Sequence, residues 1–160
     1  MNGGILPLLL ICAAAGLALS LVGRRDAWLG VTAIVLSALA VSMLNVAPGA
    51  SNIVLAGLFL STIFTAVLIY LPRSWPRRWA IPVASNAGAW AGALASLSGM
   101  QGGLWLALPL CLLCLPGRWI EHRGMGIAVK VVASWMIAIS SLALFVSLTP
   151  HPGYVPDHME

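Results

Sequence analysis

Long apolar stretches with almost no charge constrain the fold of this chain more than any other feature. Of its 160 residues, 61% are hydrophobic and 8% are charged, whereas soluble domains contain about 25% charged residues. A helix needs about 20 apolar residues to cross a hydrocarbon core of about 30 Å. The stretches that qualify are Ile5 to Val22, Ala27 to Val46, Ile53 to Leu71, Ala80 to Leu97, Leu104 to Leu115 and Met125 to Leu148. The sequence therefore predicts an all-α integral membrane protein with a six-helix transmembrane bundle.

Short segments rich in proline, glycine and arginine separate the predicted helices. After the sixth stretch, Pro150 and Pro152 prevent further helix. We therefore expect one transmembrane domain over residues 1–148 and a short proline-rich tail over residues 149–160. The first stretch is followed, not preceded, by Arg24 and Arg25. A secretory leader has the opposite order, so we expect this stretch to remain as a helix of the mature protein.

The fifth stretch is the shortest, because its purely apolar part has only 12 residues and is predicted to end before Pro116. A re-entrant segment is the alternative to a span. If it spans, all eight Lys and Arg residues lie on one side of the membrane. If it does not, Arg118, Arg123 and Lys130 lie opposite the other five. The positive-inside rule favours the span.

Charge placement also predicts the orientation of the bundle. The basic residues lie in or beside the loops after the first, third and fifth helices. We therefore expect three helical hairpins with cytoplasmic basic turns and both termini periplasmic, in a bacterial inner (plasma) membrane. We interpret the net charge of +4 as a consequence of these basic cytoplasmic turns. The expected partner is therefore the lipid bilayer and not nucleic acid. The tryptophans expected at the membrane interface are Trp28, Trp75, Trp79, Trp105 and Trp119.

A stripe of small residues on the fourth predicted helix indicates a close contact between helices. Ala84, Gly88, Gly92 and Ser96 recur every four residues and include a GxxxG pattern. Small side chains at this spacing allow two helix backbones to approach each other. We expect the contacting helix within this chain, and a second copy of the chain is the alternative.

Uncharged polar residues are the remaining candidates for a site inside the membrane. The six predicted helix cores contain no Asp, Glu, His or Arg, which argues against proton-coupled carriers and intramembrane proteases. The candidates for a polar path are Thr62, Thr65, Ser85, Asn86 and Ser134. The alternative role is a hydrogen bond between helices, or for Ser and Thr a bond to the carbonyl four residues earlier.

Cysteine and histidine residues supply the only candidates for metal or redox chemistry. Cys111 and Cys114 have C-x-x-C spacing, and His151 and His158 lie in the tail. The thiols are expected near the C-terminal end of an apolar helix, which favours a role as small hydrophobic side chains. The two tail imidazoles are seven residues apart, which favours a solvated or docking tail. No cofactor is expected, and metal binding at these four residues stays open.

The sequence leaves three functions open. We expect an accessory or scaffold subunit of a larger membrane complex, without enzymatic activity, whose partner is another membrane protein or a second copy. One alternative is a small oligomeric transporter or channel for a neutral or apolar solute. A single cavity would favour this alternative if it were lined by Thr62, Thr65, Ser85 and Asn86. The other alternative is a thiol-redox or metal-handling membrane protein.

Overall fold

The computed structural model describes residues 5–44, 48–70, 79–98, 108–123 and 126–149. Within these ranges the chain is helical and contains no strand, which confirms the predicted all-α class for this part of the chain. The α-helices are α1 (Ile5–Ser20), α2 (Arg24–Ser42), α3 (Ser51–Leu68), α4 (Ala80–Ser98), α6 (Cys114–His122) and α7 (Gly126–Leu148). The 3₁₀ segments are η1 (Pro48–Ala50) and η3 (Leu108–Leu113).

Three of the described helices, α2, α3 and α7, are long and apolar enough to cross a membrane. The helix α1 is apolar but has only 16 residues. The helix α4 has 19 residues but is built largely of Ala, Gly and Ser. The lengths and compositions of α2, α3 and α7 are those of a membrane protein.

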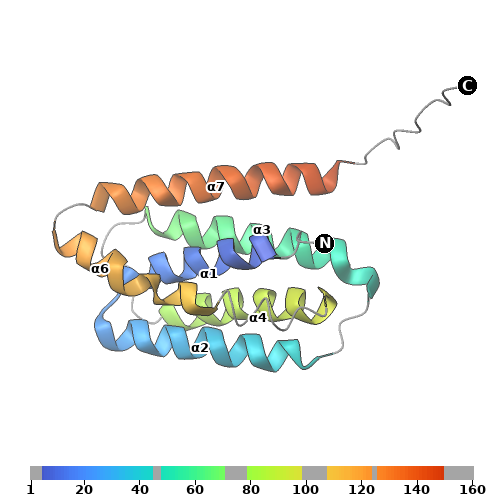
Figure 1. Ribbon diagram of the computed structural model, residues 1–160, viewed down its shortest axis with the longest axis horizontal. Helices are drawn as coiled ribbons and strands as arrows, with labels where there is room; N and C mark the ends of the chain where they lie inside the picture. The colour runs from blue at the N-terminus through green and yellow to red at the C-terminus, as the bar shows by residue number, and fades with distance from the viewer. Residues whose placement is uncertain (1–4, 45–47, 71–78, 99–107, 124–125, 150–160) are drawn as a thin grey trace, which may run out of the picture.

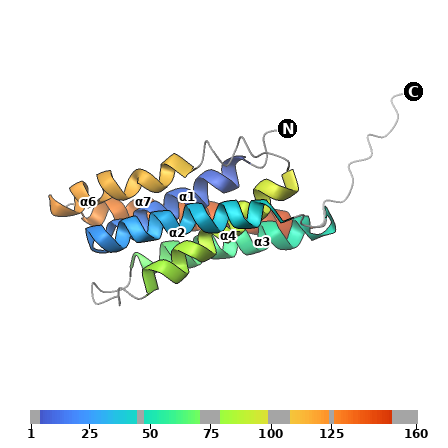
Figure 2. The same cartoon turned by 90° about the horizontal axis from the view of Figure 1, so that it is seen from below.

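The helix α1 lies inside the bundle and contacts α2, α3, α4, α6, α7 and η3 (Figures 1 and 2). Its sequence is apolar on every side, which is typical of a helix that is buried all round. Leu8, Ile11 and Ala14 have no exposed surface. Around this centre, α2 packs mainly against α4, and α3 packs against α7. The core therefore joins helices that are far apart in the sequence.

The turn between α1 and α2 is shorter than predicted. The expected loop from Gly23 to Asp26 was wrong, because α2 already begins at Arg24. Gly23 takes the N-cap position, and Asp26 lies in the first helical turn. An acidic side chain there interacts favourably with the positive end of the helix dipole. Both arginines of this turn are consequently helical residues.

The fifth helix does not end at Leu115, so that prediction was wrong. The segment η3 continues into α6, which runs to His122. Pro116 is the third residue of α6, and backbone N–H groups in the first helical turn have no partner within the helix. A proline is therefore tolerated there. Cys114 is consequently the first residue of α6 and Cys111 lies in η3 just before it, which corrects their expected position near the C-terminal end of a helix.

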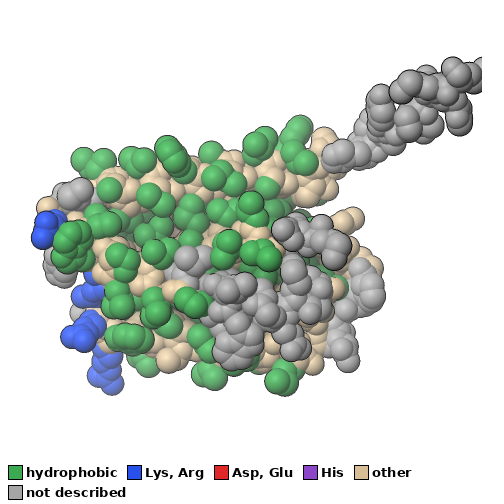
Figure 3. All heavy atoms as spheres, viewed as in Figure 1, with side chains coloured by type: hydrophobic (Ala, Val, Ile, Leu, Met, Phe, Trp, Pro, Cys, Tyr) green, Lys and Arg blue, Asp and Glu red, His purple; other side chains and the backbone are tan. Residues whose placement is uncertain are grey.

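The described Lys and Arg side chains gather at one end of the bundle, and apolar side chains cover much of the flank in view (Figure 3). Hydrogen bonds tie the helix ends together there. Arg118 of α6 donates a bond of 2.6 Å to the carbonyl oxygen of Val22, which follows α1. The Tyr70 hydroxyl, just after α3, donates a bond of 2.6 Å to the carbonyl oxygen of Lys130 in α7. These contacts bring the ends of α1, α3 and α6 and the beginning of α7 to one end of the bundle.

Candidate functional site

The small-residue stripe of α4 lies inside the bundle, directly against the backbone of α2. A Cβ atom at Gly88 would overlap the carbonyl oxygen of Ile34. A Cβ atom at Gly92 would overlap the carbonyl oxygen of Ala38. Glycine at both positions lets the two helix backbones approach more closely than any side chain would allow. The structure thus assigns α2 of the same chain as the partner of this stripe.

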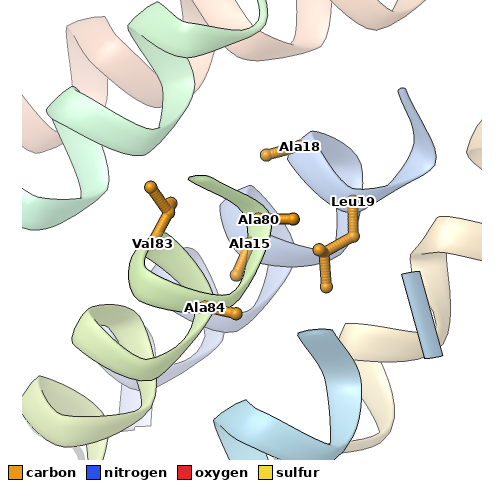
Figure 4. A pocket seen from close by; sticks show the side chains of 6 residues that line it. All are labelled: Ala15, Ala18, Leu19, Ala80, Val83 and Ala84. Atoms are coloured by element: carbon orange, nitrogen blue, oxygen red, sulfur yellow. The ribbon is translucent and has the colours of Figure 1, made fainter. Parts of the chain in front are cut away.

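The two ends of the stripe contact other parts of the chain. Ser96 donates a hydrogen bond of 2.5 Å to the carbonyl oxygen of Leu44, just after α2. Ala84 lines a gap of about 10 Å³ between α1 and α4 (Figure 4). The gap is lined by the side chains of Ala15, Ala18, Leu19, Ala80, Val83 and Ala84. A space this small and apolar has room for no solute.

Two candidates for the polar path, Thr62 and Thr65, are fully buried in α3. The Thr62 hydroxyl donates a hydrogen bond of 2.8 Å to the carbonyl oxygen of Leu58. The Thr65 hydroxyl donates a bond of 2.7 Å to the carbonyl oxygen of Ser61. Both hydroxyls therefore bond to their own helix, four residues back.

The other candidates lie apart from these threonines. Ser85 is half-buried, and Ser134 is exposed on α7, where its hydroxyl donates a bond of 2.7 Å to the carbonyl oxygen of Val131. The buried face of α7 instead carries Ser140, whose hydroxyl oxygen has no hydrogen-bond partner among the described residues. The helical spacing of the buried residues Met136 and Ser140 excludes Ser134 from that face. The candidates named from the sequence thus do not share one lining in the described part of the chain.

Asn86 is the polar candidate that joins two helices. Its side-chain amide donates a hydrogen bond of 2.7 Å to the hydroxyl oxygen of Ser61 on α3. Ser61 is buried, whereas the Asn86 side chain is exposed. An asparagine amide has two N–H donors and one carbonyl acceptor. The bond to Ser61 uses one donor, and the amide remains at the outer surface of the bundle.

A groove of about 320 Å³ runs along the outside of the bundle between α3 and α4. Its lining comprises Phe64, Leu68, Trp79, Pro82, Val83 and Asn86. Phe64 and Trp79 are more than half exposed, so the groove is open to its surroundings. Asn86 is its most polar lining residue, and apolar side chains form most of the rest. This groove is the best candidate for a functional site on this face, because a polar amide lies there on an apolar surface.

The cysteines form a different pair from the one that the spacing indicated. Cys12, Cys111 and Cys114 are all free thiols and all buried. The Cys111 thiol interacts with the Cys12 thiol on α1, which lies 99 residues away in the sequence. Among the described residues, no three His, Cys, Asp or Glu side chains gather in a group that would hold a metal ion. The tail residues His151 and His158 lie outside the described residues.

We expect the three thiols to resist alkylation in the folded protein. Each is at most 3% exposed, so N-ethylmaleimide reaches them only when the helices separate. Mass spectrometry should find almost no adduct on the protein in mild detergent and three adducts per chain after denaturation in sodium dodecyl sulfate, since the sequence contains three cysteines. Rapid alkylation of Cys111 or Cys114 in the folded protein would contradict this and would favour the thiol-redox alternative.

No known protein family, curated protein or solved structure matches this chain. The geometry of the described residues therefore carries the functional argument.

Proposed function

We propose that this chain is an accessory or scaffold subunit of a larger complex in a bacterial inner membrane. In this proposal all six helices cross the bilayer, the basic end of the bundle lies in the cytoplasm, and both termini lie in the periplasm. The segment η3 with α6 is shorter than the bilayer core and ends in Arg118, Glu121 and His122, so the fifth crossing is supported by the positive-inside rule and not by length. The gathering of described Lys and Arg side chains at one end supports the orientation.

The outward-facing amide of Asn86 carries the proposal. Asn86 lies seven residues, or about 10 Å of helix, beyond Trp79 at the start of α4. If Trp79 lies at the membrane interface, the amide is at hydrocarbon depth. The second N–H and the carbonyl oxygen of this amide, which the bond to Ser61 leaves over, cost free energy there unless they are hydrogen-bonded, and lipid tails offer no partner. A helix of another membrane protein would fill the groove and bring a polar side chain to the amide.

The internal packing supports a scaffold more than a transporter. The threonines of the predicted polar path bond to their own helix. The gap between α1 and α4 is too small for a solute. The α4 stripe is covered by α2, so the outer groove between α3 and α4 remains for a partner. We therefore assign the groove to a helix of a different membrane protein.

The test is purification in mild detergent through a C-terminal tag, followed by native mass spectrometry. We expect a second protein in stoichiometric amount with the wild-type chain and its loss in Asn86→Leu, which keeps the size of the side chain but removes the amide. Thr32→Val is the matched control, because Thr32 is an exposed polar residue of α2 whose hydroxyl bonds to its own helix. This variant should retain the partner.

Two outcomes would overturn the proposal. The first is a homogeneous wild-type protein with no other chain attached. The second is a homo-oligomer that Asn86→Leu dissociates, because the groove would then bind a second copy. Liposome flux assays on that oligomer would test the transporter alternative.

A further inference from the structure

A second groove, of about 240 Å³, lies between α2 and α6. It lies at the basic end of the bundle, where α2 begins and Arg118 is anchored on Val22. Its lining comprises Arg24, Ala27 and Trp28 from α2 with Cys114, Leu115, Arg118 and Trp119 from α6. It therefore combines two guanidinium groups with two indole rings in one place.

Helical spacing explains why these residue types meet. On α2, Arg24 and Trp28 are four residues apart and share one face. On α6, Leu115 and Trp119 have the same spacing. Asp26 lies in the first turn of α2 but does not line the groove. Among the described side chains, the groove thus brings together basic residues from two helices, and no acidic one lines it.

The electrostatics of the groove favour an anion. Backbone N–H groups in the first turn of a helix lack partners within the helix and form the positive end of its dipole. Arg24 lies in that turn of α2 and has the same sign as the dipole, so both attract an anion to this end of the groove. Arg118 adds a guanidinium from α6. Arg123 lies 4.0 Å from the centre of the Trp119 ring and adds positive charge beside the groove.

The walls of the groove favour a ligand with an apolar part. Trp28 is 45% exposed, Leu115 49% and Trp119 57%. Tryptophan at the headgroup level contacts lipid with its ring, and its N–H donates to polar groups. Large apolar side chains next to guanidinium groups offer surface for acyl chains directly beside a phosphate site.

We propose that this groove binds the headgroup of an anionic phospholipid, with Arg24 and Arg118 at the phosphate and Trp28, Leu115 and Trp119 along the glycerol and acyl chains. Basic grooves between membrane helices on the cytoplasmic side commonly hold such headgroups. The inference rests on the membrane placement in the proposed function but not on the partner at the α3–α4 groove. The lipid would hold α2 and α6 together at the basic end of the bundle.

Native mass spectrometry of the detergent-purified chain tests this inference with two lipids that have the same acyl chains. We expect dioleoyl phosphatidylglycerol to be retained about 25-fold more than dioleoyl phosphatidylcholine, because Arg24 and Arg118 each contribute a factor of about five. Arg24→Gln should lower the retention of phosphatidylglycerol about fivefold. Inorganic phosphate at millimolar concentration should not displace the lipid, because it makes no contact with the apolar wall.

Arg25→Gln is the matched control. Arg25 is exposed and adjacent to Arg24, and its loss changes the net charge equally, but it does not line the groove. It should retain phosphatidylglycerol as the wild type does. Equal losses in both variants would overturn the proposal, because diffuse surface charge would then explain binding. Equal retention of the two lipids or displacement by inorganic phosphate would also overturn it. These readouts measure lipid bound to this chain whether or not a partner protein is attached, so they separate this inference from the subunit proposal.

Discussion

Replacing Gly92 with leucine is expected to prevent α4 from packing against α2 and to abolish the monodisperse folded protein. A Cβ atom at this position already overlaps the carbonyl oxygen of Ala38. A backbone group of a packed helix cannot move aside as a flexible side chain can, so the two helices must separate. Gly92→Ala should be folded but lower the free energy of unfolding by about 2 kcal/mol, within the range for overpacked cores. Size-exclusion chromatography and thermal unfolding in detergent measure both effects.

Two other glycines supply graded controls for this prediction. At Gly126 an added Cβ meets no atom within 4 Å, so Gly126→Ala should change stability by less than about 0.5 kcal/mol. At Gly30 the three atoms nearest to the added Cβ all belong to the end of the Leu19 side chain, which can change rotamer. The loss of stability in Gly30→Ala should therefore lie between the losses in Gly126→Ala and Gly92→Ala. Inside a helix alanine is the better helix former by about 1 kcal/mol, so a loss at Gly92 must come from packing. Gly126 is the first residue of α7, outside the helix interior to which this difference applies. Equal stability of all three alanine variants would contradict the close approach of α2 and α4.

Alkaline phosphatase, which is active only outside the cytoplasm, should be active when fused after Glu160 and inactive when fused after Arg123. The physical reason is that the positive-inside rule keeps the basic turn before α7 in the cytoplasm. The last helix, α7, with 23 residues, then carries the chain across the membrane. Reporter activity normalised to the amount of fusion protein in cells measures this difference.

The same two fusions decide whether the fifth segment spans. If η3 and α6 formed a re-entrant segment, the turn after α6 would lie in the periplasm and the C-terminal tail in the cytoplasm. The two activities would then be reversed. A fusion after Gly23, at the first basic turn, should be inactive in both arrangements and serves as the control for orientation. Activity at that position would instead indicate that the whole bundle is inverted.

Helix positions were largely predictable from the sequence, because hydropathy and helix-breaking residues act locally. The fourth stretch was expected from Ala80 and begins there, and the sixth was expected to end at Leu148 and does so. Boundaries near charged residues or prolines were less predictable. Arg24 looked like a loop residue but is helical. Pro116 looked like a helix end but lies in the first turn of α6, where its missing N–H costs little.

The candidate site was predictable only in part. Asn86 was named from the sequence, because an amide within an apolar stretch is costly to leave unpaired. Its bond to Ser61 and its outward position could not be inferred, since they depend on how α3 and α4 are rotated relative to each other. The sequence did not predict the α2–α6 groove. Arg24 was interpreted only as a topology signal, and Trp28 only as a residue of the membrane interface.

The amino-acid sequence by itself determined that the described part of this chain is helical, that most of its helices are apolar, and roughly where they lie along the chain. These properties follow from backbone propensity and from the polarity of each side chain, and both are local properties of the sequence. The tertiary structure alone decided that Gly92 faces α2, that Cys111 lies against Cys12, and that Arg24 and Arg118 share one groove. Those pairings join residues far apart in the sequence. They depend on the shape of whole helix surfaces, which a pattern along the chain does not specify.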